Sequence, residues 1–279
     1  MTARSRPATR PLAYLALLAY MLFLAFPLAW LVSTALKTPR EMASLHPTWI
    51  PHHPTLGNFA AAFGEQNLVA SAGNSLLVAL SASVLTVLAA LPAAYALARS
   101  ASVLNKLALG WVLVSQVFPF ILIIIPLFMI LKNLELVNSR GGLILVYLTF
   151  NLPFALWMLQ GYVRGVPREL EEAASVDGAG RLRILRSVVA PLLVPGVVAT
   201  FLFAFISSWN EFMFALVLLK DPDLSTVPLT LVRFTGADGV ARLGPLAAAA
   251  LLATIPSLAL FALIQRRLTA GLLAGAVKG

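Results

Sequence analysis

The chain has 279 residues, of which 60% are hydrophobic and 11% charged, and its mean hydropathy is +0.90. Soluble domains rarely exceed about half apolar residues, so this composition excludes an ordinary soluble domain and predicts an integral membrane protein. The formal net charge of +9 does not indicate a nucleic-acid-binding protein, because the basic residues lie at the ends of apolar segments rather than in one patch.

Six stretches without Asp, Glu, Lys or Arg are long enough to cross a bilayer, which takes about 20 residues. They are 11–36, 66–98, 107–131, 141–163, 187–210 and 243–265. Only helices satisfy their own backbone in lipid, and the runs lack the alternation of barrel strands. The sequence therefore predicts an all-α membrane protein with six transmembrane helices. We expect them at 12–36, 70–98, 107–131, 142–163, 192–219 and 244–264, with Pro92 breaking the second and Pro119 and Pro126 bending the third.

The distribution of Lys and Arg predicts the orientation. With the N-terminus in the cytoplasm, 13 of the 20 basic residues fall on inside segments and 7 on outside segments. This bias favours both termini in the cytoplasm. The first apolar run is too long for a signal peptide, so we expect a retained helix. The predicted organisation is a basic tail at 1–11, a transmembrane domain at 12–264 and a second cytoplasmic tail at 265–279.

The first outside segment, 37–68, contains three histidines: His46, His52 and His53. Prolines between and after them spoil a helical ligand geometry, so we interpret the segment as a solvated, turn-rich loop and predict no metal site. The chain has no cysteine, which excludes disulfides and thiolate metal sites.

Nine charges lie between Arg164 and Arg186, within the predicted inside loop 164–191. Acidic residues Glu169, Glu171 and Glu172 suit the first turn of a helix, where the helix dipole favours negative charge. One face of that helix collects Leu170, Ala173, Ala174 and Asp177. Gly178 and Gly180 can end it, and a second short helix is expected at about 181–189. The loop is either a docking element for a soluble partner or an amphipathic connection between two membrane helices.

Glu211 is the one acidic residue within a predicted span. An acid inside a membrane is costly and is often functional. Two roles stay open: with Trp209 and Asn210 it lines a substrate pathway or gate, or it holds helices together. Asn151 in the fourth helix belongs to the same candidate set. None of the lysines follows a glycine, which excludes a P-loop, so any ATP must be bound by another polypeptide.

The order of residues in the charged loop resembles the EAA loop of ABC importer permeases. Glu172-Ala-Ala174 is followed by three residues, Gly178, nine residues and Val188-Val-Ala-Pro191. Val and Ala replace the usual Ile and Leu, while the spacing is kept. Trp209-Asn210-Glu211 and the C-terminal Gly275-Ala-Val-Lys-Gly279 look like the MalG-type permeases of carbohydrate importers.

The resemblance implies a type I importer permease fold in a bacterial or archaeal cytoplasmic membrane. Its coupling helix would contact an ATPase through Leu170, Glu172, Ala173, Ala174, Asp177, Gly178 and Ala179. The tail 265–279 would reach the ATPase dimer through Ala276, Val277, Lys278 and Gly279, and its glycines favour an extended form over a helix. Implied partners are a second, non-identical permease, two ATPase subunits that bind ATP and Mg, and an extracytoplasmic binding protein that delivers a sugar, with 220–243 as the surface it contacts.

Two other functions fit the sequence less well. A secondary transporter or channel would usually need coupling residues at mid-membrane and paired repeats, and the chain offers one off-centre Glu and no repeat. A non-transporting scaffold would not require the EAA spacing. The resemblance therefore predicts a non-catalytic permease subunit for a di- or oligosaccharide such as maltose or trehalose. The sequence does not distinguish among these sugars, other oligosaccharides and glycerol phosphate.

Overall fold

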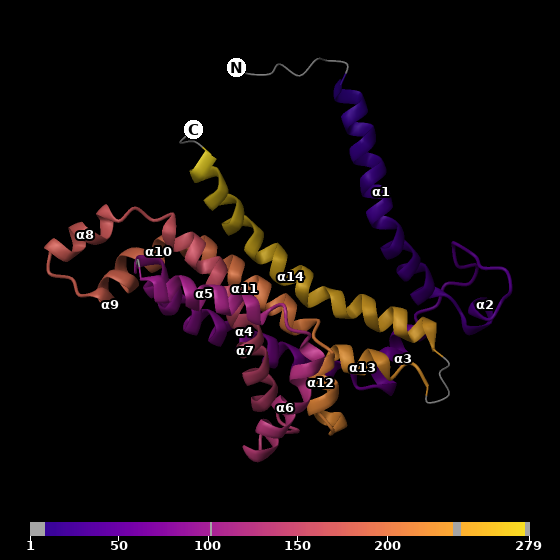
Figure 1. The fold of residues 1–279 in the computed structure, drawn as a ribbon. Coiled ribbons are helices and arrows are strands. Elements are labelled where there is room, and N and C mark those ends of the chain that lie inside the picture. The colour runs from indigo at the N-terminus through magenta and orange to yellow at the C-terminus, as the bar shows by residue number, and fades with distance from the viewer. Residues whose placement is uncertain (1–8, 101, 237–240, 277–279) are drawn as a thin grey trace. The chain divides into compact units, whose positions relative to one another are not determined.

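The computed structural model describes residues 9–100, 102–236 and 241–276. Within these ranges the regular structure is helical, with one isolated antiparallel bridge between Thr235 and Ala241. The predicted all-α class is confirmed. The chain divides into two compact units, one formed by 1–68 with 231–254 and the other by 69–230 with 255–279. Figure 1 labels the helices along the chain.

The first unit contains α1 (Thr9–Leu36), α2 (Pro39–Met42), α3 (Gly57–Glu65) and the first part of α14 (Leu243–Ala276). The buried amide of Asn58 donates to the backbone carbonyls of Ala35 and Lys37, at 2.9 and 2.8 Å. Carbonyls at a helix end have no partner within the helix. Asn58 therefore closes the end of α1 and fixes where the following loop begins.

The second unit contains most of the remaining helices, and α7 (Arg140–Arg164) is its central element. α7 packs against α5, α11 and α12. Its inward residues, such as Leu143, Tyr147 and Leu159, are at most 2% exposed. The other elements are α4 (Leu68–Arg99), α5 (Val103–Ser115), α6 (Phe120–Asn133), α8 (Glu169–Val176), α9 (Arg181–Ile184), the π-helix η1 (Leu185–Val189), α10 (Ala190–Leu192), α11 (Val194–Trp209), α12 (Met213–Leu218), the 3-10 helix η2 (Pro222–Leu224) and α13 (Val227–Val232).

Polar side chains near the start of α4 bind the segment that follows α12. The amide of Asn74 donates to the carbonyls of Asp223 and Ser225, at 2.8 and 3.1 Å. The hydroxyl of Ser75 accepts from the Val227 amide at 2.8 Å. These bonds satisfy backbone groups that a short irregular segment leaves unpaired, so they position the segment 223–227 on α4.

Four described helices are long and apolar enough to cross a membrane alone: Pro11–Leu36, Leu68–Arg99, Arg140–Arg164 and Leu243–Gln265. They correspond to the first, second, fourth and sixth predicted spans. A fifth candidate is the pair Arg181–Leu192 and Val194–Trp209, which are bent by 79° relative to each other. The prediction of a break at Pro92 is wrong, because α4 continues through that residue.

The third predicted span is two helices rather than one bent helix. α5 ends at Ser115 and α6 begins at Phe120, with Pro119 at the start of α6. Proline has no N–H and disfavours helical backbone at the residue before it. Pro126, in contrast, lies inside α6 without ending it.

The fifth predicted helix, 192–219, is also divided, into α11 and α12. The sixth is longer than predicted, because α14 is helical through Ala276. The expectation of an extended tail from residue 265 is therefore wrong up to that residue. Val277, Lys278 and Gly279 lie outside the described residues.

Candidate functional site

The loop 164–191 forms a short helix, α8, followed by a glycine turn and the run α9–η1–α10. In Figure 1, α8 and α9 lie at one end of the second unit, away from α6. Residues 181–192 make an angle of 79° with α11. If α11 crosses the membrane, this run lies nearly parallel to the membrane surface, as the amphipathic prediction for 181–189 requires.

Glu171 holds α8 against the end of α4. Its carboxylate accepts a hydrogen bond from the Tyr95 hydroxyl at 2.8 Å and forms an ion pair with Arg99 at 2.6 Å. Both charged side chains are largely buried, at 14% exposure for Arg99 and 12% for Glu171. Arg99 also donates to the Val166 carbonyl at 2.8 Å. One carboxylate thus connects the loop to a membrane-spanning helix.

Beyond this anchor, most of α8 is exposed. Glu172, Ala173 and Asp177 are exposed, and Leu170 is 44% exposed. Val176 is 88% exposed, although it is an apolar residue on a helix. Exposed apolar and acidic residues that form one surface are typical of a contact site for another protein.

Ala174 and Ala179 lie on the inner side and pack on a small core beneath the loop, together with Val163, Ile184 and Val189. The predicted single face that included Ala174 is therefore split. Ala173 belongs to the exposed face and Ala174 to the packed face, as a 100° rotation per residue requires.

Gly178 ends α8 in a Schellman turn. Its φ is +81°, in the left-handed region that favours glycine. The Gly178 amide donates to the Ser175 carbonyl and the Ala179 amide to the Ala174 carbonyl, both at 3.0 Å. These are the two bonds of the Schellman motif. The glycine of the predicted motif thus has a conformational role at the turn.

A groove of about 840 Å³ lies between the end of α4 and the pair α8–α9. Charged residues line much of it: Arg99, Arg168, Glu171, Glu172 and Arg181. A polar groove of this size suits a protein segment with complementary charges better than an apolar small molecule.

Glu211 lies in the break between α11 and α12. Its carboxylate accepts hydrogen bonds from the Phe214 and Ala215 amides, at 2.9 and 3.2 Å, and from the Tyr147 hydroxyl at 2.8 Å. The first helical amides have no partner within their helix, and an acid at this end is favoured by the dipole. Glu211 therefore starts α12 and connects it to α7.

The other three residues of the candidate pathway are arranged around this break. Asn151 is buried and donates to the Tyr147 carbonyl at 2.9 Å and to the Ser208 hydroxyl at 3.0 Å. Trp209 is buried and stacks on Phe205, with ring centroids 5.8 Å apart. Asn210 is exposed and bonds back to the Ile206 carbonyl. The four predicted residues thus meet at one place, where α7 contacts the end of α11.

The sequence analysis did not predict the contacts of Glu171 with Tyr95 and Arg99 or the contact of Tyr147 with Glu211. A Glu among other glutamates in a charged loop carried no signal for an inward orientation. Arg99 is the first basic residue after the second apolar run. It was the one sequence feature that could have indicated an inward-facing acid in the loop, because a charge at the end of a span needs a partner. Among the described residues, no three His, Asp or Glu side chains gather into a group that could hold a metal ion.

Comparison with known proteins supports a single family. Residues 82–273 match the family described as binding-protein-dependent transport system inner membrane component. A relative from Streptomyces antibioticus, a putative ABC transporter permease protein, is 61% identical over 82% of this chain and 100% of its own length. A sulfoquinovosyl glycerol transport system permease protein from Agrobacterium fabrum is 38% identical, over 97% of this chain and 94% of its own.

The fold is also found in a solved structure. A chain of a bacterial ABC transporter that imports the acidic polysaccharide alginate superposes with a TM-score of 0.78, covering 95% of this chain and 98% of that one. The two sequences are 18% identical, so this match concerns the fold alone.

Proposed function

Since this chain belongs to the family of binding-protein-dependent transport system inner membrane components, we propose that it is one permease subunit of an ATP-driven importer for a di- or oligosaccharide. Membership confirms three expectations from the sequence: an ABC permease, a multi-pass membrane protein, and a subunit that is not itself an enzyme. The sugar class is supported by the relative named for sulfoquinovosyl glycerol transport and by the MalG-like residues Trp209-Asn210-Glu211 at the end of α11 and in the break after it. Maltose and trehalose are the substrates that the sequence resemblance suggests.

The coupling role of the loop 164–191 is carried by one observation: α8 is bound to α4 on one side and exposed on the other. In the proposed complex, an ATPase subunit contacts Glu172, Ala173 and Asp177 on the exposed side. ATP and Mg are bound by the ATPase subunits, and closure of their dimer moves α8. The ion pair between Glu171 and Arg99 passes this movement to α4.

A second path leads from the loop to α11. The core under the loop contains Val189 and Leu193, and the bend of 79° lies at the start of α11. A rigid movement of α8 and α9 would therefore be transmitted to α11 through packed side chains, because a close-packed core transmits strain. The residues around the Glu211 break, at the other end of α11, would form the pathway or gate.

The remaining partners follow from the same assignment. A second, non-identical permease would complete the channel, and a binding protein would deliver the sugar to the segment 220–243. Within that segment, the bonds from Asn74 and Ser75 give a fixed backbone to 223–227, which suits a contact surface. The C-terminal residues from Ala276 onward would approach the ATPase dimer interface. Both chain termini would lie in the cytoplasm of a bacterial or archaeal cell.

The experiment is sugar uptake by proteoliposomes that contain this chain, its second permease, the ATPase and the cognate binding protein. We expect accumulation of one labelled sugar from a panel with maltose and trehalose, and only with both ATP and the binding protein. Uptake that needs neither would indicate a secondary transporter and would contradict the proposal. Uptake of a non-sugar solute that requires both ATP and the binding protein would support an ATP-driven importer and contradict the assignment of a sugar as its substrate.

A further inference from the structure

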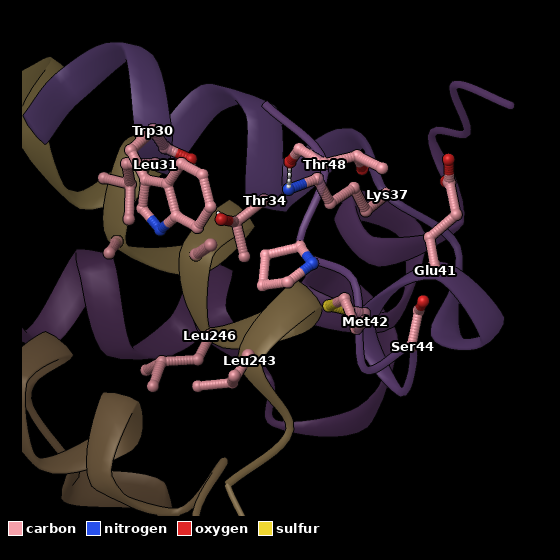
Figure 2. A pocket seen from close by; sticks show the side chains of 13 residues that line it. Trp30, Leu31, Thr34, Lys37, Glu41, Met42, Ser44, Thr48, Leu243 and Leu246 are labelled. Atoms are coloured by element: carbon pink, nitrogen blue, oxygen red, sulfur yellow. Dashed lines mark hydrogen bonds between the residues drawn. The ribbon is translucent and has the colours of Figure 1, made fainter. Parts of the chain in front are cut away.

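A pocket in the first unit is unrelated to the coupling loop and to the Glu211 break. Its volume is about 370 Å³, and it is enclosed by the end of α1, the loop through residues 41–48 and the start of α14 (Figure 2). Its walls are mainly apolar, with Leu31, Leu243, Leu246 and Ala250 among the lining residues. Every lining residue belongs to the first unit.

A buried cation lies in this apolar pocket. Lys37 is 5% exposed, and its ammonium lies 4.3 Å from the centre of the Trp30 ring. It donates one hydrogen bond, to the Thr48 carbonyl, as Figure 2 shows. An ammonium carries three donors, and no described carboxylate forms an ion pair with it. Buried charges are normally paired, so within the part of the chain that the structure describes this cation is without its usual counter-charge.

The one acidic side chain among the described lining residues does not pair with Lys37. Glu41 is the one carboxylate among the described residues that line the pocket, and its oxygens bind the amides of Thr38 and His52, at 3.2 and 2.6 Å. The His52 amide lowers the pKa of Glu41, so this acid is ionised and its bonds are used within the loop. The Thr48 side-chain hydroxyl, also at the pocket, is buried without a hydrogen-bond partner.

The pocket lies at the ends of two membrane spans. The span Pro11–Leu36 ends directly before Lys37, and the span Leu243–Gln265 begins at a lining residue. Span ends lie where lipid tails meet headgroups. Trp30 and the 64% exposed Trp49 stand edge to face at 5.1 Å, and tryptophans are enriched at this depth.

We propose that this pocket binds an anionic phospholipid, with the headgroup phosphate on Lys37 and an acyl chain along Leu31, Leu243 and Leu246. An amphiphile fits both features at once, a cation without a counter-charge and an apolar wall at a span end. A sugar fits less well, because Lys37 already covers a face of the Trp30 ring, and few polar groups remain for its hydroxyls. The lipid would hold the loop 41–48 and the start of α14 to the end of α1.

The test is native mass spectrometry of the full-length chain with added dioleoylphosphatidylglycerol. Substitution Lys37→Met removes the charge and keeps the length, and we expect about tenfold weaker binding, the effect of losing one charge-assisted hydrogen bond. Lys132→Met, at an exposed lysine at the end of α6, is the matched control and should bind as the wild type does.

A second variant tests the proposal even if Lys37→Met fails to fold. Ala250→Phe fills the pocket from its wall and leaves Lys37 in place, and we expect a similar loss of phosphatidylglycerol binding. The proposal is overturned if the folded Lys37→Met or Ala250→Phe variant binds this lipid as tightly as the wild type. It is also overturned if inorganic phosphate displaces the lipid from the wild type, since the pocket would then recognise a free anion.

Discussion

Glu171 in the loop 164–191 and Glu211 in the helix break both pair a carboxylate with a tyrosine hydroxyl, in different settings. Each carboxylate accepts a hydrogen bond from a tyrosine at 2.8 Å, Tyr95 for Glu171 and Tyr147 for Glu211. Glu211 completes its contacts with two backbone amides of α12. Glu171 completes them with Arg99, while its neighbour Glu172 remains exposed.

Under the proposed function, the loop is the region that binds a partner, and the break is a region whose side chains bind one another. At the break, Asn151, Trp209 and Glu211 contact groups of α7, α11 and α12. In the loop, one buried ion pair fixes α8, and the other face has acids and apolar side chains in solvent. Val176 is 88% exposed beside exposed acids, and the proposed ATPase contact would cover these residues.

The largest expected effect is at the Glu171 anchor. Glu171→Gln leaves Arg99 largely buried without its counter-charge, and breaking such a pair costs about 3 kcal/mol. Thermal unfolding of the purified permease measures the loss, and limited trypsin digestion at Arg181 and Arg183 reports release of the loop. Glu169→Gln, at an exposed glutamate of the same helix, is the control and should leave both measurements unchanged. Equal behaviour of the two variants would show that the ion pair does not hold the loop.

A smaller effect is expected at the helix break. Glu211→Gln removes the charge from three hydrogen bonds, and we expect a loss of about 2 kcal/mol. Tyr147→Phe removes one of these bonds, with an expected loss of about 1 kcal/mol. Transport kinetics separate the two roles of Glu211. A variant that loses stability but keeps sugar selectivity supports a structural role, whereas changed selectivity at unchanged stability supports a pathway contact.

The smallest effect is at the glycine turn. Gly178→Ala places a Cβ at φ +81°, which costs about 1 kcal/mol. Gly180 has φ −72°, and a Cβ added there would meet open space, so Gly180→Ala is the matched control. We expect lower unfolding temperature and weaker ATPase assembly for the Gly178 variant only. A Gly180 variant that is equally impaired would mean that the left-handed turn is not the cause.

Much of the fold could be predicted from charge-free runs alone. Four predicted spans are single helices. Three of them end close to the flanking charges, whereas α14 continues past Arg266 and Arg267 to Ala276. The two divided spans could not be located in this way. The sequence stays apolar on both sides of Pro119 and of Glu211, so hydropathy does not show either break. At Pro119 the backbone has no N–H to donate, and at the second break the Phe214 amide donates to the Glu211 carboxylate.

The site was predictable to a similar degree. The spacing of the motif identified Gly178 as the glycine of the loop 164–191. The structure shows that Gly178 has left-handed backbone, with φ +81°. Helix periodicity alone could not tell which glutamate of α8 faces inward, since that depends on where Tyr95 and Arg99 lie in space. The pocket at Lys37 had no sequence signal either, because it joins residues about 200 positions apart along the chain.

The central claim is that the exposed face of α8 binds the ATPase. The most direct measurement is binding-protein-stimulated ATP hydrolysis in proteoliposomes by the assembled transporter with Glu172→Lys. Glu135→Lys, the same charge reversal at an exposed residue of the loop after α6, is the control. We predict that the Glu172 variant keeps its helices and loses ATPase co-purification and stimulated hydrolysis, while the control retains both. Wild-type assembly and stimulation in the Glu172 variant would contradict the account.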